Sequence, residues 1–132
     1  MILSRPIVIA LIVGFFAVLL TPVAHAAESV TYEVVSNDIP TAGGIEYFDG
    51  SARQVLQNVP LPWRTNVTIA NPRSLGTDGA EVRADWRNSI AAPVWRPGKW
   101  VTVRIYIGKT LRCQNTLDVG NAACYGSTGF KS

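Results

Sequence analysis

Histidine and cysteine are scarce in this chain of 132 residues, and the scarcity excludes several kinds of chemistry. The single histidine, His25, lies in an N-terminal segment that we expect to be removed. Without imidazole, neither a Ser-His-Asp nor a Cys-His catalytic site can be assembled, and the commonest zinc ligand is missing. The two cysteines have the spacing of no zinc motif, and no glycine-rich phosphate loop occurs. The sequence therefore predicts a non-enzymatic protein without a metal or another cofactor.

A pair of catalytic carboxylates, as in glycosidases, is the alternative that this composition leaves open. Asp49 and Asp78 fall in predicted turns. Glu81 and Asp85 alternate with arginines along a predicted strand, on the side that faces solvent. We therefore interpret these carboxylates as solvated charges.

Blocks of like charge are also missing. Loss of Arg5 with the N-terminal segment leaves eleven Lys and Arg side chains against nine Asp and Glu, a net charge of +2. Because charges of both signs alternate along the chain, the sequence argues against a nucleic-acid partner.

The N-terminus has the three regions of a secretory signal. Arg5 lies in a short polar start, residues 7–20 are apolar apart from Gly14, and Ala24-His25-Ala26 forms a small-x-small cleavage site. A retained signal anchor is the alternative, but fourteen helical residues rise only about 21 Å against roughly 30 Å of hydrocarbon. We expect a signal peptide over 1–26 and one mature domain of 106 residues over 27–132.

Helical periodicity is absent from the mature chain, and short alternating segments predict strands instead. Turn-rich or loop-like stretches at 37–44, 71–79 and 88–99 separate them. Asp49-Gly50 and Gly108-Lys109 have the composition of tight hairpin turns. The predicted strands cover 30–35, 45–48, 52–59, 63–70, 81–87, 101–107, 111–113 and a last short segment around Cys124. About seven strands with regular turns predict an all-β fold, a small antiparallel β-sandwich of immunoglobulin-like shape, with a small closed barrel as the alternative.

The strand at 101–107 has the clearest pattern. Its apolar residues alternate without a break, so we expect them to line one face of a central strand. The expected core comprises Val101, Val103, Ile105 and Ile107, packed against Trp63, Val67, Ile69 and Trp86.

The two cysteines, Cys113 and Cys124, predict a disulfide in an oxidising compartment. We expect Cys113 at the end of one strand and Cys124 in the last strand, so that the bond joins the last strand to its neighbour. Two free buried thiols are the alternative. A redox function would require a lowered thiolate pKa and usually a Cys-x-x-Cys motif, neither of which is visible.

The segment from Trp95 to Trp100 is the candidate binding surface, because tryptophan and arginine dominate interaction hot spots. Trp95, Arg96 and Lys99 are the candidate residues. The interpretation that we favour for the segment is structural, with Trp100 at the start of a strand and packed in the core, and Trp95 holding the loop.

Several short motifs resemble the mycobacterial small membrane protein (MmpS) family. Val30-Thr31-Tyr32-Glu33-Val34 is similar to the opening strand of that family, and Tyr47-Phe48-Asp49-Gly50 to its first hairpin. Val59-Pro60-Leu61-Pro62-Trp63 resembles its proline-tryptophan signature, and Arg104-Ile105 with Gly108-Lys109 its penultimate hairpin. A terminal cysteine such as Cys124 also fits. Together the motifs extend over most of residues 30–124.

The resemblance implies an accessory role beside a large resistance-nodulation-division (RND) type transporter that exports lipids or siderophores. It places a β-sandwich on the outer side of the inner membrane, in the periplasm or cell envelope, or secreted, with a transporter, another envelope protein, or a lipid or apolar ligand as partner. Three features depart from the family: the segment 1–26 looks cleavable, Val103 stands where the family has its first cysteine, and residues 71–99 are longer. The alternative is a secreted binding, scaffold or antigen-like domain without a transporter.

Overall fold

The computed structural model describes residue 14 and residues 26–87, 98–118 and 121–132. The predicted signal segment therefore lies almost wholly outside the described residues. Within the described part, no helix is long and apolar enough to cross a membrane.

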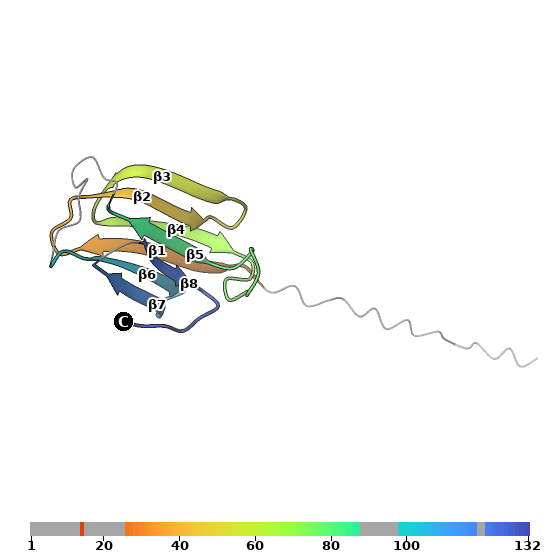
Figure 1. Cartoon of the computed structure of the whole chain (residues 1–132). Coiled ribbons are helices and arrows are strands. Elements are labelled where there is room, and N and C mark those ends of the chain that lie inside the picture. The colour runs from red at the N-terminus through yellow and green to blue at the C-terminus, as the bar shows by residue number, and fades with distance from the viewer. Residues whose placement is uncertain (1–13, 15–25, 88–97, 119–120) are drawn as a thin grey trace, which may run out of the picture.

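The described residues form eight strands and confirm the predicted all-β sandwich (Figure 1). The strands are β1 (Glu28–Ser36), β2 (Thr41–Phe48), β3 (Arg53–Pro60), β4 (Trp63–Ile69), β5 (Glu81–Asp85), β6 (Val101–Ile107), β7 (Thr110–Leu117) and β8 (Asn121–Tyr125). They build two four-stranded antiparallel sheets. Sheet A has the order β4-β1-β6-β7, and sheet B has the order β3-β2-β5-β8.

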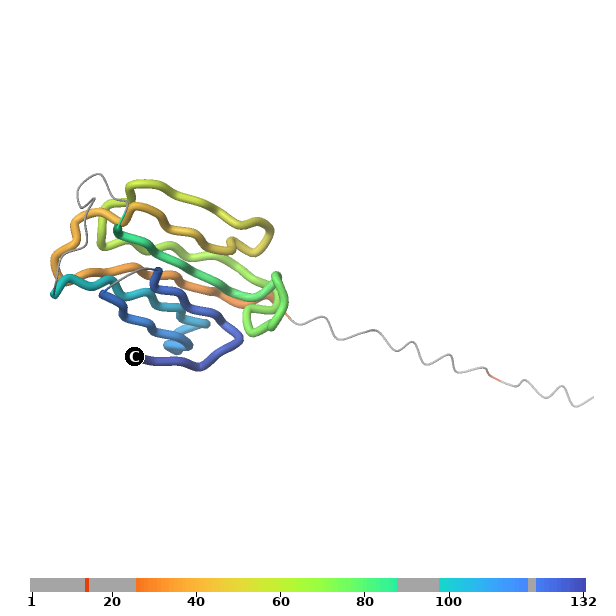
Figure 2. The backbone as a smooth tube through the Cα atoms, viewed as in Figure 1, coloured from red at the N-terminus to blue at the C-terminus, as the bar shows by residue number. Residues whose placement is uncertain are grey.

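Hairpins join β2 to β3 and β6 to β7, as predicted from their turn residues, while other consecutive strands lie in opposite sheets (Figure 2). Gly50 has φ 100° and Gly108 has φ 60°, backbone conformations that glycine adopts without steric cost. Asp49 Oδ1 accepts hydrogen bonds from the backbone N–H groups of Ser51 and Ala52, at 2.8 and 2.7 Å. These bonds hold the first hairpin turn in shape.

The core lies between the sheets and is built from alternate residues of the strands. β6 is central in sheet A, and its four predicted inward residues, Val101, Val103, Ile105 and Ile107, are buried. Trp86 is also fully buried, just past the end of β5. Trp63 and Val67 pack against the core but remain partly exposed, because β4 lies at the edge of its sheet.

Two strand boundaries differ from the sequence prediction by four residues, and smaller shifts of one or two residues occur at other strands. β2 begins at Thr41, within the stretch predicted as turn, because Ala42 pairs with Val59 and is buried against the core. β7 continues past Cys113 to Leu117, because Thr116 and Leu117 pair with the first residues of β6. In both cases cross-strand pairing outweighs local turn composition.

Candidate functional site

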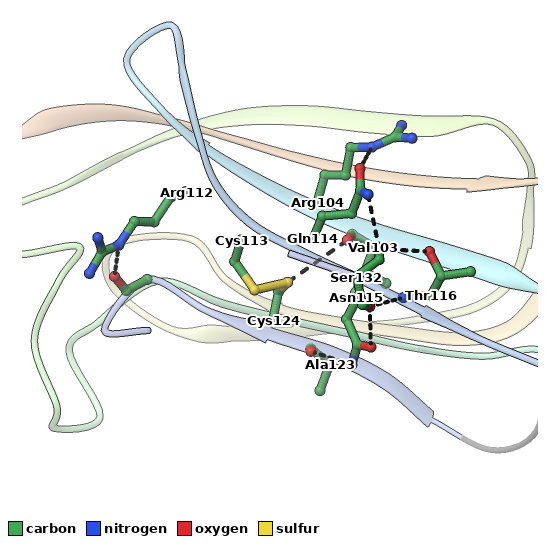
Figure 3. The surroundings of a disulfide bond; sticks show 11 residues. Val103, Arg104, Arg112, Cys113, Gln114, Asn115, Thr116, Ala123, Cys124 and Ser132 are labelled. Atoms are coloured by element: carbon green, nitrogen blue, oxygen red, sulfur yellow. Dashed lines mark hydrogen bonds between the residues drawn. A yellow bond between two sulfur atoms is a disulfide. The ribbon is translucent and has the colours of Figure 1, made fainter. Parts of the chain in front are cut away.

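The predicted disulfide between Cys113 and Cys124 is present, with a Cα–Cα distance of 5.7 Å (Figure 3). Cys113 lies in the middle of β7 and Cys124 in β8, and both side chains are buried. The prediction that Cys113 ends its strand is wrong, because β7 continues to Leu117. The bond does join the last strand, β8, to a neighbouring strand, but that strand lies in the other sheet. β7 belongs to sheet A and β8 to sheet B, so the disulfide connects the two sheets across the core.

The C-terminal residues add further bonds on the same side of the sandwich. Gln114 N–H donates to Phe130 O at 2.7 Å, and Ser132 N–H donates to Gln114 O at 3.0 Å, which forms a short parallel bridge along β7. Asn115 Nδ2 donates to Ala123 O in β8 at 3.0 Å. We call this edge the closed side; it comprises β7, β8 and residues 130–132.

The opposite edge, formed by β3 and β4, carries partly exposed apolar side chains that pack against the core. We call it the open side. Its apolar row consists of Leu56 on β3, Leu61 between the two strands, Trp63 and Val67 on β4, and Tyr47 on the neighbouring strand β2. Cys113, Ala122 and Cys124 of the closed side are buried, whereas the residues of the apolar row remain partly accessible. Among the described residues, the open side has no cross-link comparable to the disulfide.

Aromatic rings connect the open side with the core. The Trp63 and Tyr47 ring centroids lie 5.2 Å apart, and the Tyr47 and Tyr32 centroids lie 5.6 Å apart, both pairs tilted. Tyr32 is fully buried, and its hydroxyl donates to Phe48 O at 2.8 Å. Such tilted pairs are favourable beyond their burial, so they hold the Trp63 ring in place.

The segment that forms the open side has little charge. From residue 54 to residue 69 the only charged side chain is Arg64, which pairs with Glu33 on the outer face of sheet A at 3.2 Å. The open side therefore favours an apolar or neutral partner over a polyanion.

The outer face of sheet B carries alternating charges that pair with one another. Arg53 contacts Glu46 at 3.0 Å and Glu81 at 2.6 Å. Arg87 bonds to Asp85 at 2.8 Å, and this hydrogen-bonded pairing lowers the pKa of the Asp85 carboxyl. Because these carboxylates are bound by arginines, we interpret them as members of structural ion pairs.

A polar hollow of about 500 Å³ lies on this face over Gly43 and Gly44, where side chains are missing. Glu46, Arg83 and Asp85 are among its lining residues. Because these charged groups engage one another or neighbouring arginines, the hollow offers few free polar groups to a ligand.

The outer face of sheet A is a connected polar layer. Glu33 accepts from Arg64 and from Arg104, the latter at 2.7 Å, and Arg104 Nε donates to Gln114 Oε1 at 2.7 Å. Thr102 and Thr116 hydroxyls bond to each other at 2.8 Å. Because these polar groups already form hydrogen bonds and ion pairs with one another, the open side is the better candidate for binding.

The predicted binding segment is only partly described. Trp95 and Arg96 lie outside the described residues. Lys99 forms an ion pair with Asp38. Trp100 is partly buried and is absent from the core cluster, because its place just before β6 leaves it at the end of the sandwich.

The sequence interpretation missed the open side as a site, because it assigned Trp63 to the core. The available signal was the uncharged stretch from residue 54 to residue 63, in which apolar residues predominate. No group of three or more potential metal ligands occurs among the residues with defined positions. Neither a protein-family model nor a curated protein sequence matches this chain.

Proposed function

We propose that this protein is a non-catalytic, exported cell-envelope domain that binds an apolar ligand or an apolar surface of a partner protein at its open side. The observation that carries the proposal is the partly exposed apolar row along β3 and β4, opposite a closed side that is fixed by a disulfide.

The chemistry of the open side supports this choice. When a partner buries its exposed apolar groups, the free energy of binding becomes more favourable by roughly 25 cal/mol per Å² of apolar surface removed from water. Trp63 and Tyr47 offer large rigid surfaces of the kind that dominate binding hot spots. The shortage of charge around them keeps the desolvation cost of binding low.

The resemblance to the mycobacterial small membrane protein family gives the proposal a biological setting. In that setting the domain is an accessory of an RND-type transporter and contacts the transporter or its lipid or siderophore cargo on the outer side of the inner membrane. The inter-sheet disulfide fits an oxidising compartment of this kind.

Binding of a fluorescent fatty-acyl probe to the full chain tests the proposal. Val67→Thr keeps the shape and strand preference of the side chain but adds a hydroxyl to the apolar row. An unpaired hydroxyl buried against an acyl chain costs about 1–2 kcal/mol, so we expect the probe to bind roughly tenfold more weakly.

The matched control is Val55→Thr, the same substitution on the outward side of β3, where Val55 is 58% exposed. This variant should bind the probe as the unmodified chain does. Equal losses in both variants, or no probe binding at all, would contradict an apolar ligand at the open side.

Co-purification of the chain with envelope membranes tests the proposed contact with a transporter. Recovery only as a free protein from culture fluid would favour the alternative of a secreted domain.

A further inference from the structure

Gly44 lies in the interior of β2 at a position where the backbone does not require glycine. It does not have a positive φ, and a Cβ there would meet no atom closer than the Leu56 carbonyl oxygen, at 4.0 Å. Glycine weakens the interior of a strand, and there it often marks a bulge, a sharp bend or a place where a ligand approaches the backbone. The pairing of β2 with β3 and β5 has no register shift, so no bulge accounts for Gly44. The geometry therefore favours a ligand that lies over this residue.

The strand register surrounds Gly44 with one row of side chains on the outer face of sheet B. Gly44 lies between Gln57 of β3 and Asp85 of β5, and Asp85 pairs in turn with Asn121 of β8. The missing side chain leaves the polar hollow of about 500 Å³ open, and small-molecule sites have volumes of roughly 300–1,000 Å³. The row therefore has a carboxamide at each end and a gap large enough for a small ring between them.

The charged groups on this face neutralise one another, whereas the two amides have no side-chain partner. Three arginines pair with three carboxylates, namely Arg53, Arg83 and Arg87 with Glu46, Glu81 and Asp85. Within the part of the chain that the structure describes, the side chains of Gln57 and Asn121 form no hydrogen bond. The few polar groups that remain for a ligand are thus neutral, and each of them both donates and accepts.

We propose that this hollow binds one ring of a neutral saccharide. A sugar hydroxyl donates and accepts hydrogen bonds, as a carboxamide does, so Gln57 and Asn121 match hydroxyls on opposite sides of a ring. Val55, which is 58% exposed beside the hollow, offers an apolar contact to the C–H groups of the ring. A charged sugar would bring a charge whose possible counter-ions are already paired, and burial of an unpaired charge is costly. This site lies apart from the open side, and the inference goes beyond the proposed function.

Titration of the full chain with the neutral methyl glycosides of glucose, galactose and mannose, followed through its backbone amide NMR signals, tests the site. We expect at least one of them to bind with a dissociation constant of about 1–10 mM and to shift the signals of Gly44 and Asn121. The methyl glycoside of glucuronate should bind at least about threefold more weakly than that sugar. The inference is overturned if none of the three binds up to about 50 mM, or if the glucuronate binds equally well or better.

Substitution of Gly44 separates the loss of the hollow from a loss of folding. Valine suits a strand interior and fills the space over the backbone, so Gly44→Val should be at least as stable as the unmodified chain in urea denaturation. Its affinity for the sugar should nevertheless fall at least about tenfold. Gly44→Ala, which adds one methyl group, should give a smaller loss of affinity at equal or higher stability. A folded Gly44→Val variant that binds the sugar with unchanged affinity would rule out the site.

The two amides have a matched control on the other sheet. Gln57→Ala and Asn121→Ala should each weaken sugar binding about fivefold, because each removes one pair of hydrogen bonds to the ring. Asn66→Ala removes an exposed amide from the outer face of sheet A and should bind as the unmodified chain does. Unchanged binding in both hollow variants, or an equal loss in Asn66→Ala, would contradict recognition by these amides.

Discussion

Tyr32 links the two sheets through a single hydroxyl group. From β1 of sheet A, the hydroxyl donates to Phe48 O and accepts a hydrogen bond from Glu81 N–H at 3.2 Å, both in sheet B. The ring is fully buried, and burial raises the pKa of the phenol. Tyr32 is therefore a neutral polar group in the core whose hydroxyl both donates and accepts a hydrogen bond.

Replacement of Tyr32 by phenylalanine should lower the free energy of unfolding by about 1–2 kcal/mol, because two backbone groups lose their partner. Urea denaturation measures this difference. Tyr106→Phe, on the partly exposed outer face of sheet A, is the matched control and should change stability little. A Tyr32→Phe variant as stable as the unmodified protein would show that the hydroxyl contributes nothing to the contact between the sheets.

Asp49 gives the first hairpin turn a dependence on pH. Hydrogen bonds from Ala52 N–H and Ser51 N–H, followed by bonds from the side chains of Gln54 and Ser51, hold the pKa of this carboxyl well below its ordinary value of 3.8. A depressed pKa in the folded state means that the contribution to stability is present above pH 4 and is lost as the pH falls further.

Asp49→Asn should therefore flatten the loss of stability below pH 4, since the variant has no carboxylate to protonate. Thermal unfolding at pH values between 7 and 2 measures the effect. Asp78→Asn, in the exposed loop before β5, serves as the control. If Asp49→Asn has the same acid profile as the unmodified chain, the turn carboxylate has no part in acid unfolding.

At the scale of elements, residues 130–132 act as a short extra strand on β7. Gln114 exchanges backbone bonds with Phe130 and Ser132, and Gln114 Nε2 also donates to Ser132 O at 2.9 Å. This segment covers backbone groups of an edge strand that would otherwise be free to pair with another chain.

Removal of residues 130–132 should raise the tendency to aggregate and lower the free energy of unfolding by about 1–3 kcal/mol, because two backbone bonds and the side-chain bond are lost. Light scattering at constant concentration and urea denaturation measure the two effects. Lys131→Ala, which keeps the backbone bonds, should resemble the unmodified chain. A truncated chain that stays monomeric and equally stable would contradict the covering role.

How far the sequence predicts these elements depends on what each pattern encodes. The alternation in Val101–Ile107 gave the core face of β6 correctly, because burial on one face imposes a period of two. Thr41–Gly44 has the composition of a turn but pairs along β3 and β5, so tertiary pairing decided its structure. The pairing of the two cysteines was predictable because the sequence contains only two. Their placement in opposite sheets was not predictable from the sequence.

The candidate site was not predictable for a related reason. Alternation shows that Trp63 and Val67 point inward, but it carries no information on which strands form the edges of a sheet. The strand order β4-β1-β6-β7 is set by pairing between residues far apart in the sequence. Only that order shows that the inward residues of β4 reach the surface.

The whole molecule is held together unequally across its width. The disulfide closes a loop of about a dozen residues, which stabilises the fold by about 3 kcal/mol in the chain-entropy model.

Because both sulfurs are buried, we expect a reductant to cleave the disulfide slowly in the folded protein and quickly when denaturant is present. Thiol labelling under the two conditions measures this, with Cys113→Ser/Cys124→Ser as the non-reactive control; equal rates would show that the disulfide is accessible in the folded state.

The bond between β7 and β8 has a consequence for the direction in which the fold opens. Because the disulfide fixes the two sheets to each other along one edge, the sheets are expected to separate first along the opposite edge, at β3 and β4. Amide hydrogens of β3 and β4 should then exchange with deuterium in a lower-energy opening than those of β6 and β7. The sheets would part first around Trp63 and return to the same register each time, because the covalent edge never lets them drift apart.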